Sequence, residues 1–342
     1  MPTAPAALTA LLDRLDAAAA RKPAPGLLPD VISRDGGKHG YHVVFGCIIH
    51  GDEVGSLPAA ARLLDGLDAG TISYGGRVSV LLGNRPAALA GVRFLEEDLN
   101  RVFLPGPARS AEHRRALALM PLLDAADLFL DLHQTIEPTR SAFAIFPWDA
   151  AGEAWVRALD AAPAWVTRPP GLAFSAGSRC GDEHVLARNP PGITVELSQK
   201  GFSDDAEALA FRLMVRALQL ADVLAGGAAT LEELAANRPL PTCYVPAHAV
   251  PFDDAAMALR PGLQNLAPVT AGELLSAPAS PPITSPCDGV LLFPKYPPRG
   301  PDGRAVGPLP AELVRILAPL HAQPAALWGG AAPATGATPP SA

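Results

Sequence analysis

Short apolar runs alternate with longer stretches of helical periodicity over roughly residues 27 to 225. The apolar runs are typical of buried strands, and they cover 41–49, 77–82, 127–132, 142–146 and 193–197. Apolar positions that recur on one helical face predict helices over 54–67, 108–123 and 206–224. Strands that alternate with helices predict an α/β fold, with a mixed, mostly parallel sheet and helices on both of its faces.

The pattern changes after Gly226, where proline becomes dense and helical periodicity fades. Short apolar runs over 242–245 and 289–293 are bounded by Pro, Gly and Asp, which is typical of a small β-rich domain. The final stretch is mostly Ala, Pro, Gly and Thr, a composition that predicts disorder. We therefore predict a main domain over 1–238, a small β-rich domain over 239–323 and a disordered tail over 324–342.

Charge and composition limit the partners of the chain. The net charge is −7, the pI is about 5.6 and only 18% of the residues are charged. These values do not favour binding to nucleic acid or to an anionic membrane. The first 22 residues lack the basic start and uninterrupted apolar core of a signal peptide. The four cysteines are widely spaced, so they indicate no disulfide framework, and we expect a cytoplasmic protein.

Four residues of types that can bind a metal ion or a proton lie at, or just beyond, the ends of predicted strands. His50 and Glu53 come just after the first strand, His133 follows another, and Glu196 lies near the end of the last. The carboxyl ends of parallel strands meet at one edge of the sheet, where ligands bind. Two histidines and one glutamate form a common catalytic zinc set that leaves a fourth position for water. Each residue alone is also compatible with a structural role, although an unpaired Glu196 is costly inside an apolar strand.

A polar loop supplies further candidates between the predicted sheet elements. Arg93, Asn100 and Arg101 occur within a segment that reads RFLEEDLNRVF from 93 to 103. Arginine offers a planar fork of donors that suits carboxylates and developing oxyanions. The alternative is a surface loop whose charges offset one another, since 96–98 are all acidic.

These motifs, taken in order, resemble the succinylglutamate desuccinylase/aspartoacylase family, a branch of the zinc carboxypeptidase-like hydrolases. The matching segments are HGDE from 50, DLNRVF from 98, LDLH from 130 and VEL from 195, and they span roughly 41 to 201. The family's small β-rich C-terminal domain also fits this chain.

The resemblance implies roles for particular residues. It implies one Zn²⁺ per chain, bound by His50, Glu53 and His133, with Glu196 as the general base. It also implies that Arg93 polarises the scissile carbonyl. It further implies that Asn100 and Arg101 grip a substrate carboxylate, with Asp98 bracing the loop.

The chain departs from the family's pattern at two positions. Asp52 replaces the usual Asn between the ligands, at a position that binds no metal. Leu186 stands where members of the family place a substrate-binding arginine, and Arg179 and Arg188 lie nearby but out of register. Recognition of a second substrate carboxylate therefore remains open, as does any role for two tyrosines of the C-terminal region, Tyr244 and Tyr296.

The resemblance predicts a zinc-dependent hydrolase that cleaves the amide bond of an N-acylated amino acid or a similar small amide with a carboxylate. Glu196 would accept a proton from zinc-activated water and pass it to the leaving amine. Two alternatives remain: a zinc carboxypeptidase that acts on small peptides, and a non-catalytic binding protein on the same scaffold. A homo-oligomer is compatible with the chain length, and no motif decides it.

Overall fold

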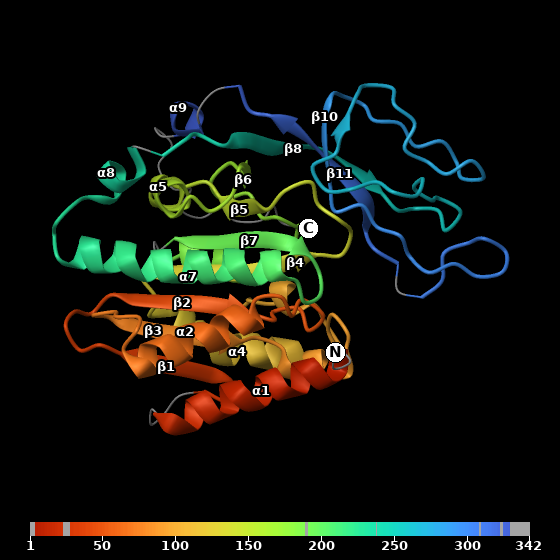
Figure 1. Cartoon of the computed structure of the whole chain (residues 1–342). Helices are drawn as coiled ribbons and strands as arrows, with labels where there is room; N and C mark the ends of the chain where they lie inside the picture. Colours follow the sequence, from red (N-terminus) through yellow and green to blue (C-terminus); the bar gives the residue numbers. More distant parts are fainter. Residues whose placement is uncertain are drawn as a thin grey trace.

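The computed structural model of the protein describes residues 4–22, 28–188, 191–236, 238–307, 309–321 and 324–328. Within these ranges the strands are β1 (Val31–Asp35), β2 (His42–Cys47), β3 (Arg77–Leu82), β4 (Leu128–Thr135), β5 (Phe143–Pro147), β6 (Ala164–Arg168), β7 (Gly192–Gln199), β8 (Thr242–Pro251), β9 (Pro268–Val269), β10 (Gly289–Leu292) and β11 (Glu312–Pro319). They join into one 11-stranded sheet in the order β1-β3-β2-β4-β7-β5-β6-β8-β11-β10-β9. Figure 1 shows this sheet running through the molecule, with the C-terminal strands at one end.

Parallel pairing in the middle of the sheet places the candidate residues at one edge. Strand β2 pairs in parallel with both β3 and β4, and β4 pairs in parallel with β7. The carboxyl ends of β2, β4 and β7 therefore meet on the same side, which is where an α/β sheet binds its ligands. The antiparallel pairs involve β1 with β3, β5 with β7 and the C-terminal strands.

The described helices are α1 (Ala4–Arg21), α2 (Leu57–Ala69), α3 (Arg85–Ala90), the short 3-10 helix η1 (Leu99–Arg101), α4 (Ala111–Asp124), α5 (Ala150–Leu159), α6 (Gly181–Leu186), α7 (Asp204–Ala225), α8 (Leu231–Ala236) and α9 (Pro324–Trp328). None of them is both long and apolar enough to cross a membrane.

Helices cover both faces of the sheet because side chains alternate along its buried strands. In β2, Val43 and Phe45 join one apolar cluster with residues of α1, α2, α5 and α7. Val44 points the other way and joins a second cluster with Leu119 of α4 and Val185 of α6. Every residue of β2 is buried, as expected for a strand between two helical layers.

Helix α4 starts at a serine cap, and its first turn contacts the polar loop of the functional site. The Ser110 side chain accepts a hydrogen bond from the backbone N–H of His113 at 2.9 Å, which satisfies one of the free amides at the start of the helix. The predicted helix over 108–123 therefore begins at Ala111 instead. Glu112 in the first turn is buried and faces the polar loop that precedes the helix.

The C-terminal strands continue the main sheet and also build a core of their own. Strand β8 pairs in parallel with β6, and β11, β10 and β9 follow with antiparallel pairing. Val314 and Leu275 belong to an apolar cluster formed by this region alone. Leu292 and Leu317 instead share a cluster with Phe143 of β5. The C-terminal region is thus β-rich, as predicted, and it is attached through β6.

The predicted α/β fold class, with a small β-rich C-terminal part, is confirmed. The predicted disordered tail over 324–342 is wrong for its first residues, which form α9. The ring of Trp328 packs against Trp148, with the ring centres 6.0 Å apart, and this apolar contact holds the short helix. The remainder of the predicted tail lies outside the described residues.

Candidate metal centre

A tight turn after β2 presents the first candidate ligand. Ile48 adopts a φ of 47°, a left-handed conformation that is uncommon for a β-branched residue. Gly51 follows, and a Cβ atom there would lie 2.4 Å from the carbonyl carbon of Ala87, so only glycine fits. This close approach turns the chain sharply and brings His50 and Glu53 to the carboxyl edge of the sheet.

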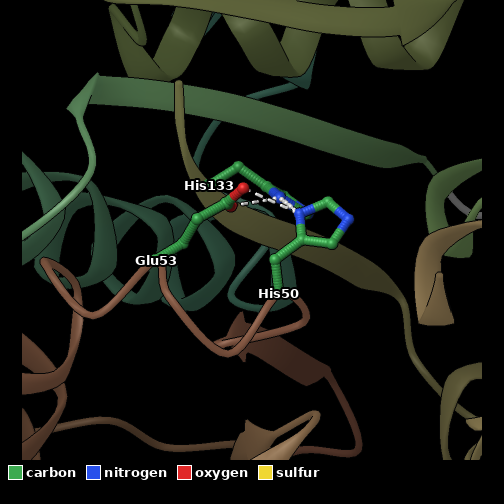
Figure 2. A group of neighbouring side chains, drawn as sticks. All are labelled: His50, Glu53 and His133. Atoms are coloured by element: carbon green, nitrogen blue, oxygen red, sulfur yellow. Dashed lines mark hydrogen bonds and ion pairs between the residues drawn. The ribbon is translucent and has the colours of Figure 1, made fainter. Parts of the chain in front are cut away.

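The structure brings His50, Glu53 and His133 together, as the sequence predicted (Figure 2). The Glu53 carboxylate lies 2.8 Å from Nδ1 of His50 and 2.8 Å from Nδ1 of His133. The two Nδ1 atoms are 3.2 Å apart, and all three residues are buried. Two nitrogen ligands of a tetrahedral zinc ion lie roughly 3.3 Å apart, given Zn–N distances of about 2.0–2.1 Å. The donor types and their spacing therefore fit such an ion.

Each histidine is oriented by a carboxylate on its other ring nitrogen. Nε2 of His50 lies 2.9 Å from Oδ1 of Asp98, and Nε2 of His133 lies 2.8 Å from Oδ2 of Asp131. Such partners keep the proton on Nε2, which leaves Nδ1 free to bind a metal. Asp98 was expected only to brace its loop, whereas Asp131 was assigned no role. Its position two residues before His133, on the same face of a strand, was the signal in the sequence.

The charges of the three candidate ligands depend on one another. Burial acts to raise the pKa of Glu53, but His50 and His133 outweigh it and hold that pKa well below its usual range. Burial acts in the opposite direction on His133, and its neighbours Asp131 and Glu53 hold the pKa of His133 well above its usual range. A cation is thus favoured at this point, either as a proton on histidine or as a metal that displaces it.

Glu196 lies beside this centre and has a different environment. It pairs in register with His133 on the neighbouring strand and is buried. Its Oε2 atom has no hydrogen-bond partner among the described residues. Burial, together with the charge of Glu53, raises the pKa of Glu196 to about 7. A carboxylate with that pKa can accept or donate a proton near neutrality.

Arg93 reaches the same cluster from the polar loop. Its Nη1 atom donates to Oε1 of Glu53 at 2.9 Å, and its Nη2 atom lies 2.8 Å from Nε2 of His50. In any one tautomer, Nε2 of His50 either accepts from Arg93 or donates to Asp98. The donors of Arg93 point at the centre, and its guanidinium is a candidate for binding a developing negative charge.

Asn100 and Arg101 lie beside the centre in η1. Oδ1 of Asn100 accepts from the backbone N–H of Gly181 at 2.9 Å, which fixes the side chain near His133. Arg101 is largely buried, and its Nη1 donates to the carbonyl of Asn100 and contacts Sγ of Cys180. Among the described residues, no carboxylate forms an ion pair with Arg101. The predicted role of this pair in gripping a carboxylate stays a prediction.

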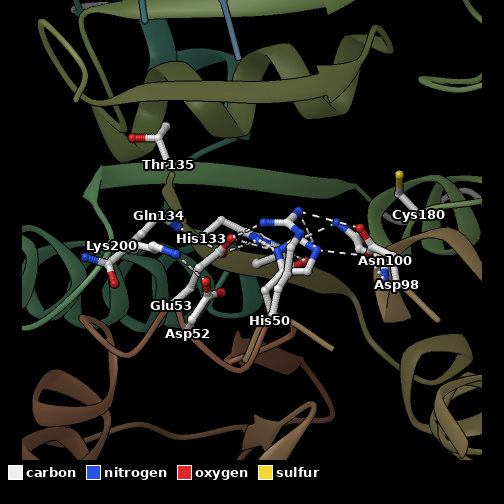
Figure 3. Close-up of polar contacts among 12 residues, drawn as sticks. His50, Asp52, Glu53, Asp98, Asn100, His133, Gln134, Thr135, Cys180 and Lys200 are labelled. Carbon is white, nitrogen blue, oxygen red and sulfur yellow. Dashed lines mark hydrogen bonds and ion pairs between the residues drawn. The ribbon is translucent and has the colours of Figure 1, made fainter. Parts of the chain in front are cut away.

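Two bracing contacts at the site were missed in the sequence (Figure 3). The side chain of Gln134 accepts from Gly55 N at 2.7 Å and donates to the carbonyls of Gln199 and Gly201, each at 2.9 Å. Lys200 binds Asp52 with an Nζ–Oδ2 distance of 2.6 Å. Both contacts tie the loop that carries Glu53 to the end of β7. No local pattern identifies these pairs, because the partners are more than 60 residues apart in the sequence.

The structure places the residues whose roles the sequence left open: Leu186, the two nearby arginines and the two tyrosines. Leu186 is the last residue of α6, and Arg188 just beyond it pairs with Asp124 of α4 at 3.3 Å. Arg179 runs beside η1, where its backbone pairs with that of Arg101. The hydroxyl of Tyr296 donates to Arg260 O at 2.9 Å, within the C-terminal region. Tyr244 lies on β8.

The fold and the site define an α/β protein with a buried His–Glu–His candidate metal centre at the carboxyl edge of its sheet. A family model, described as the succinylglutamate desuccinylase/aspartoacylase catalytic domain, matches residues 39–220. The chain therefore belongs to this family, as the motifs predicted.

Similar proteins and structures agree with this membership. A succinylglutamate desuccinylase from Pseudomonas paraeruginosa is 32% identical over 167 residues, which cover 46% of this chain and 46% of that protein. One from Pseudomonas fluorescens SBW25 is 36% identical over 110 residues, covering 29% of this chain and 33% of that protein. The chain thus spans about half or less of the length of the curated relatives it matches.

Solved structures share the fold over most of the chain. A succinylglutamate desuccinylase from Chromobacterium violaceum aligns over 90% of this chain and 98% of its own, with a TM-score of 0.63 and 21% identity. A product-bound ectoine utilization protein from Ruegeria pomeroyi covers 84% and 88%, with a TM-score of 0.60 and 20% identity. At these identities the likeness is one of fold.

Proposed function

We propose that the protein is a zinc-dependent hydrolase that cleaves the amide bond of an N-acylated amino acid or a similar small amide bearing a carboxylate. One observation carries the proposal: three buried ligand atoms lie within 4.8 Å of one another, next to Glu196, whose Oε2 has no hydrogen-bond partner among the described residues and whose pKa is raised to about 7. Family membership supports the same reading, because the reported curated relatives and the structure from Chromobacterium violaceum are named as succinylglutamate desuccinylases.

His50, Glu53 and His133 would hold one zinc ion per chain. When bound, zinc supplies Lewis acidity, which polarises a carbonyl oxygen and lowers the pKa of a water molecule towards about 7. His50 and His133 would present Nδ1 because Asp98 and Asp131 hold the proton on Nε2. The ligand set would leave a position open for water or substrate.

Glu196 would take the proton of the attacking water and deliver it to the leaving amine. Its pKa of about 7 suits both halves of this transfer, since a base near the working pH is ionised often enough and still releases the proton. Arg93, whose donors already point at Glu53 and His50, would bind the oxygen on which negative charge develops. Asn100 and Arg101 would hold the carboxylate of the substrate.

A substrate panel tests the proposal. The zinc-loaded protein is offered N-acetyl, N-formyl and N-succinyl amino acids beside dipeptides, and released amine is measured. We expect hydrolysis of at least one N-acyl amino acid and little cleavage of dipeptides. Cleavage of dipeptides alone would identify a carboxypeptidase. Bound zinc with no hydrolysis of any amide would instead leave a binding protein.

A further inference from the structure

A buried carboxylate on α4 is bound by consecutive backbone amides of the polar loop. Glu112, which is 2% exposed, accepts from Leu95 N at 2.7 Å and from Glu97 N at 3.3 Å. The amide of Glu96 also points at it, with distances of 3.5 and 3.3 Å to its two oxygens. A fourth donor, Nδ2 of Asn84, lies 3.2 Å away. One side chain thus fixes three successive residues of the loop.

This carboxylate has no cationic partner among the described residues. Burial acts to raise the pKa of Glu112, but the amide donors, led by Leu95 N, outweigh it and hold the pKa below its usual range. A buried carboxylate without a cation is costly unless hydrogen bonds replace its water. A concave run of backbone N–H groups can do so, provided that the loop keeps this one conformation. The charge of Glu112 and the shape of the loop therefore require each other.

The two ends of the loop lie at the metal centre. Arg93 precedes Leu95 by two residues and contacts Glu53, and Asp98 follows the held segment and contacts His50. Between them, Glu112 holds the backbone over three residues, 95–97. The carbonyl of Arg93 accepts from Gly51 N at 2.9 Å, and Glu112 fixes the chain from Leu95 onwards, so the course of the backbone that carries the Arg93 side chain depends on both contacts.

The other contacts of the loop, with the first residue of α4 and the two residues before it, are more exposed. Glu97 pairs with Arg109 at 2.8 Å, and its Oε2 accepts from Ser110. Glu96 accepts from Ala111 N at 2.9 Å. Exposed ion pairs contribute little to stability, so they cannot hold the loop as firmly as the buried carboxylate does. They are useful as matched controls.

We propose that Glu112 is a positioning residue that sets the place of Arg93 and Asp98 at the metal centre through the backbone amides of 95–97. The claim about the loop stands on its contacts alone, whereas the consequence for catalysis rests on the proposed function. Glu112 touches neither the candidate ligands nor Arg93, so it acts only through the loop.

Two readouts test the proposal in the zinc-loaded full chain. In Glu112→Gln, hydrogen exchange of the amides of 95–97 is expected to speed up at least tenfold, because a Gln amide group turns a donor towards them. With the N-acyl amino acid that the wild type hydrolyses best, kcat is expected to fall about a hundredfold, as for a small misplacement of a positioned group. KM and zinc content are expected to change less than about threefold.

The control is Glu97→Gln, in the same loop, which removes the exposed pair with Arg109 and is expected to leave both readouts near the wild-type values. A double-mutant cycle that combines Glu112→Gln with Arg93→Ala separates an effect on the position of Arg93 from a general loosening of the loop. If Glu112 acts through Arg93, then Glu112→Gln lowers kcat much less in the Arg93→Ala background than in the wild type.

Each outcome decides the claim. Unchanged exchange of 95–97 in Glu112→Gln would overturn the proposal even if no substrate were found, because this measurement needs no activity. Faster exchange with unchanged kcat, or equal losses of kcat in both backgrounds, would also overturn it. Failure of the wild type to hydrolyse any amide would count against the proposed function alone, and Glu112→Ala, which removes the carboxylate outright, then serves as the second test of loop exchange.

Discussion

The carboxylate of Asp131 accepts a hydrogen bond from the imidazole of His133, two residues later on the same strand. The Nε2–Oδ2 distance is 2.8 Å, and Asp131 is fully buried. Residues two apart in a strand share one face, so β4 presents both side chains at the sheet edge as a rigid unit. The orientation of one candidate ligand is therefore built into the strand.

Removing the charge of Asp131 should weaken metal binding. We expect Asp131→Asn to lower the affinity for zinc by about 10- to 100-fold, because the partner of a ligating histidine sets its tautomer and basicity. Competition with a fluorescent chelator measures this. The control is Asp127→Asn, just before the same strand, where the carboxylate accepts from His42 N. Equal affinities in the two variants would contradict the assignment.

The histidines themselves should determine metal content. We expect about one zinc per chain in the wild type, measured by elemental analysis, and its loss in His50→Ala and in His133→Ala. His184→Ala is a matched control, since that buried histidine pairs with Asp124 away from the centre. Unchanged metal content in both ligand variants would show that the metal, if any, binds elsewhere.

Glu196 should make the metal-free protein less stable as the pH rises. Its pKa is raised from 4.5 to about 7 by burial, so its contribution is fully present below pH 4.5 and is lost as the pH rises through about 7. Glu196→Gln does not titrate. The stability of the variant relative to the wild type should therefore increase between pH 4.5 and pH 8, by up to about 3 kcal/mol. Urea unfolding of chelator-treated protein at the two pH values measures this difference.

The same variant separates base from ligand. Zinc-loaded Glu196→Gln is expected to keep its metal and to lose nearly all turnover, since an amide cannot accept the proton of water. Turnover near the wild-type value would remove Glu196 as the base.

The ion pair between Lys200 and Asp52 should couple two loops in stability measurements. Lys200 is 38% exposed, so solvent screens the pair, and a double-mutant cycle with Lys200→Met and Asp52→Asn should give a coupling of about 1 kcal/mol. Lys200→Met alone should destabilise more than the double variant does, because it leaves a largely buried carboxylate unpaired. Additive effects in thermal unfolding would contradict a direct interaction.

Periodicity and short motifs were enough to predict the α/β class and the central strands. Strands β3 and β7 lie almost where their apolar runs placed them, since a strand that is buried on both faces is mostly apolar. The sequence could predict that His50, Glu53 and His133 lie together, because the carboxyl ends of parallel strands meet at one edge of the sheet. Local sequence carried these inferences.

Contacts between distant segments could not be predicted in the same way. Gln134 forms hydrogen bonds with residues 65 and 67 positions later in the sequence. Glu112 binds backbone amides that lie 15 to 17 positions earlier in the sequence. A glutamate in the first turn of a helix looks like an ordinary partner of the helix dipole. Only the fold shows that its oxygens face the backbone of another segment. The pairing of β8 with β6 was likewise invisible, since no short pattern announces a parallel neighbour 78 residues away.

That last pairing has a consequence for how the chain can be divided. Removing everything after 238 would take β8 away and leave β6 as an open edge, because the backbone groups of β6 that face away from β5 would be free to template association between molecules. It would also uncover Phe143 and Val166, which share an apolar cluster with Leu317. The C-terminal region is thus a protective end piece for the sheet, and the two parts of the chain should unfold together as one cooperative unit.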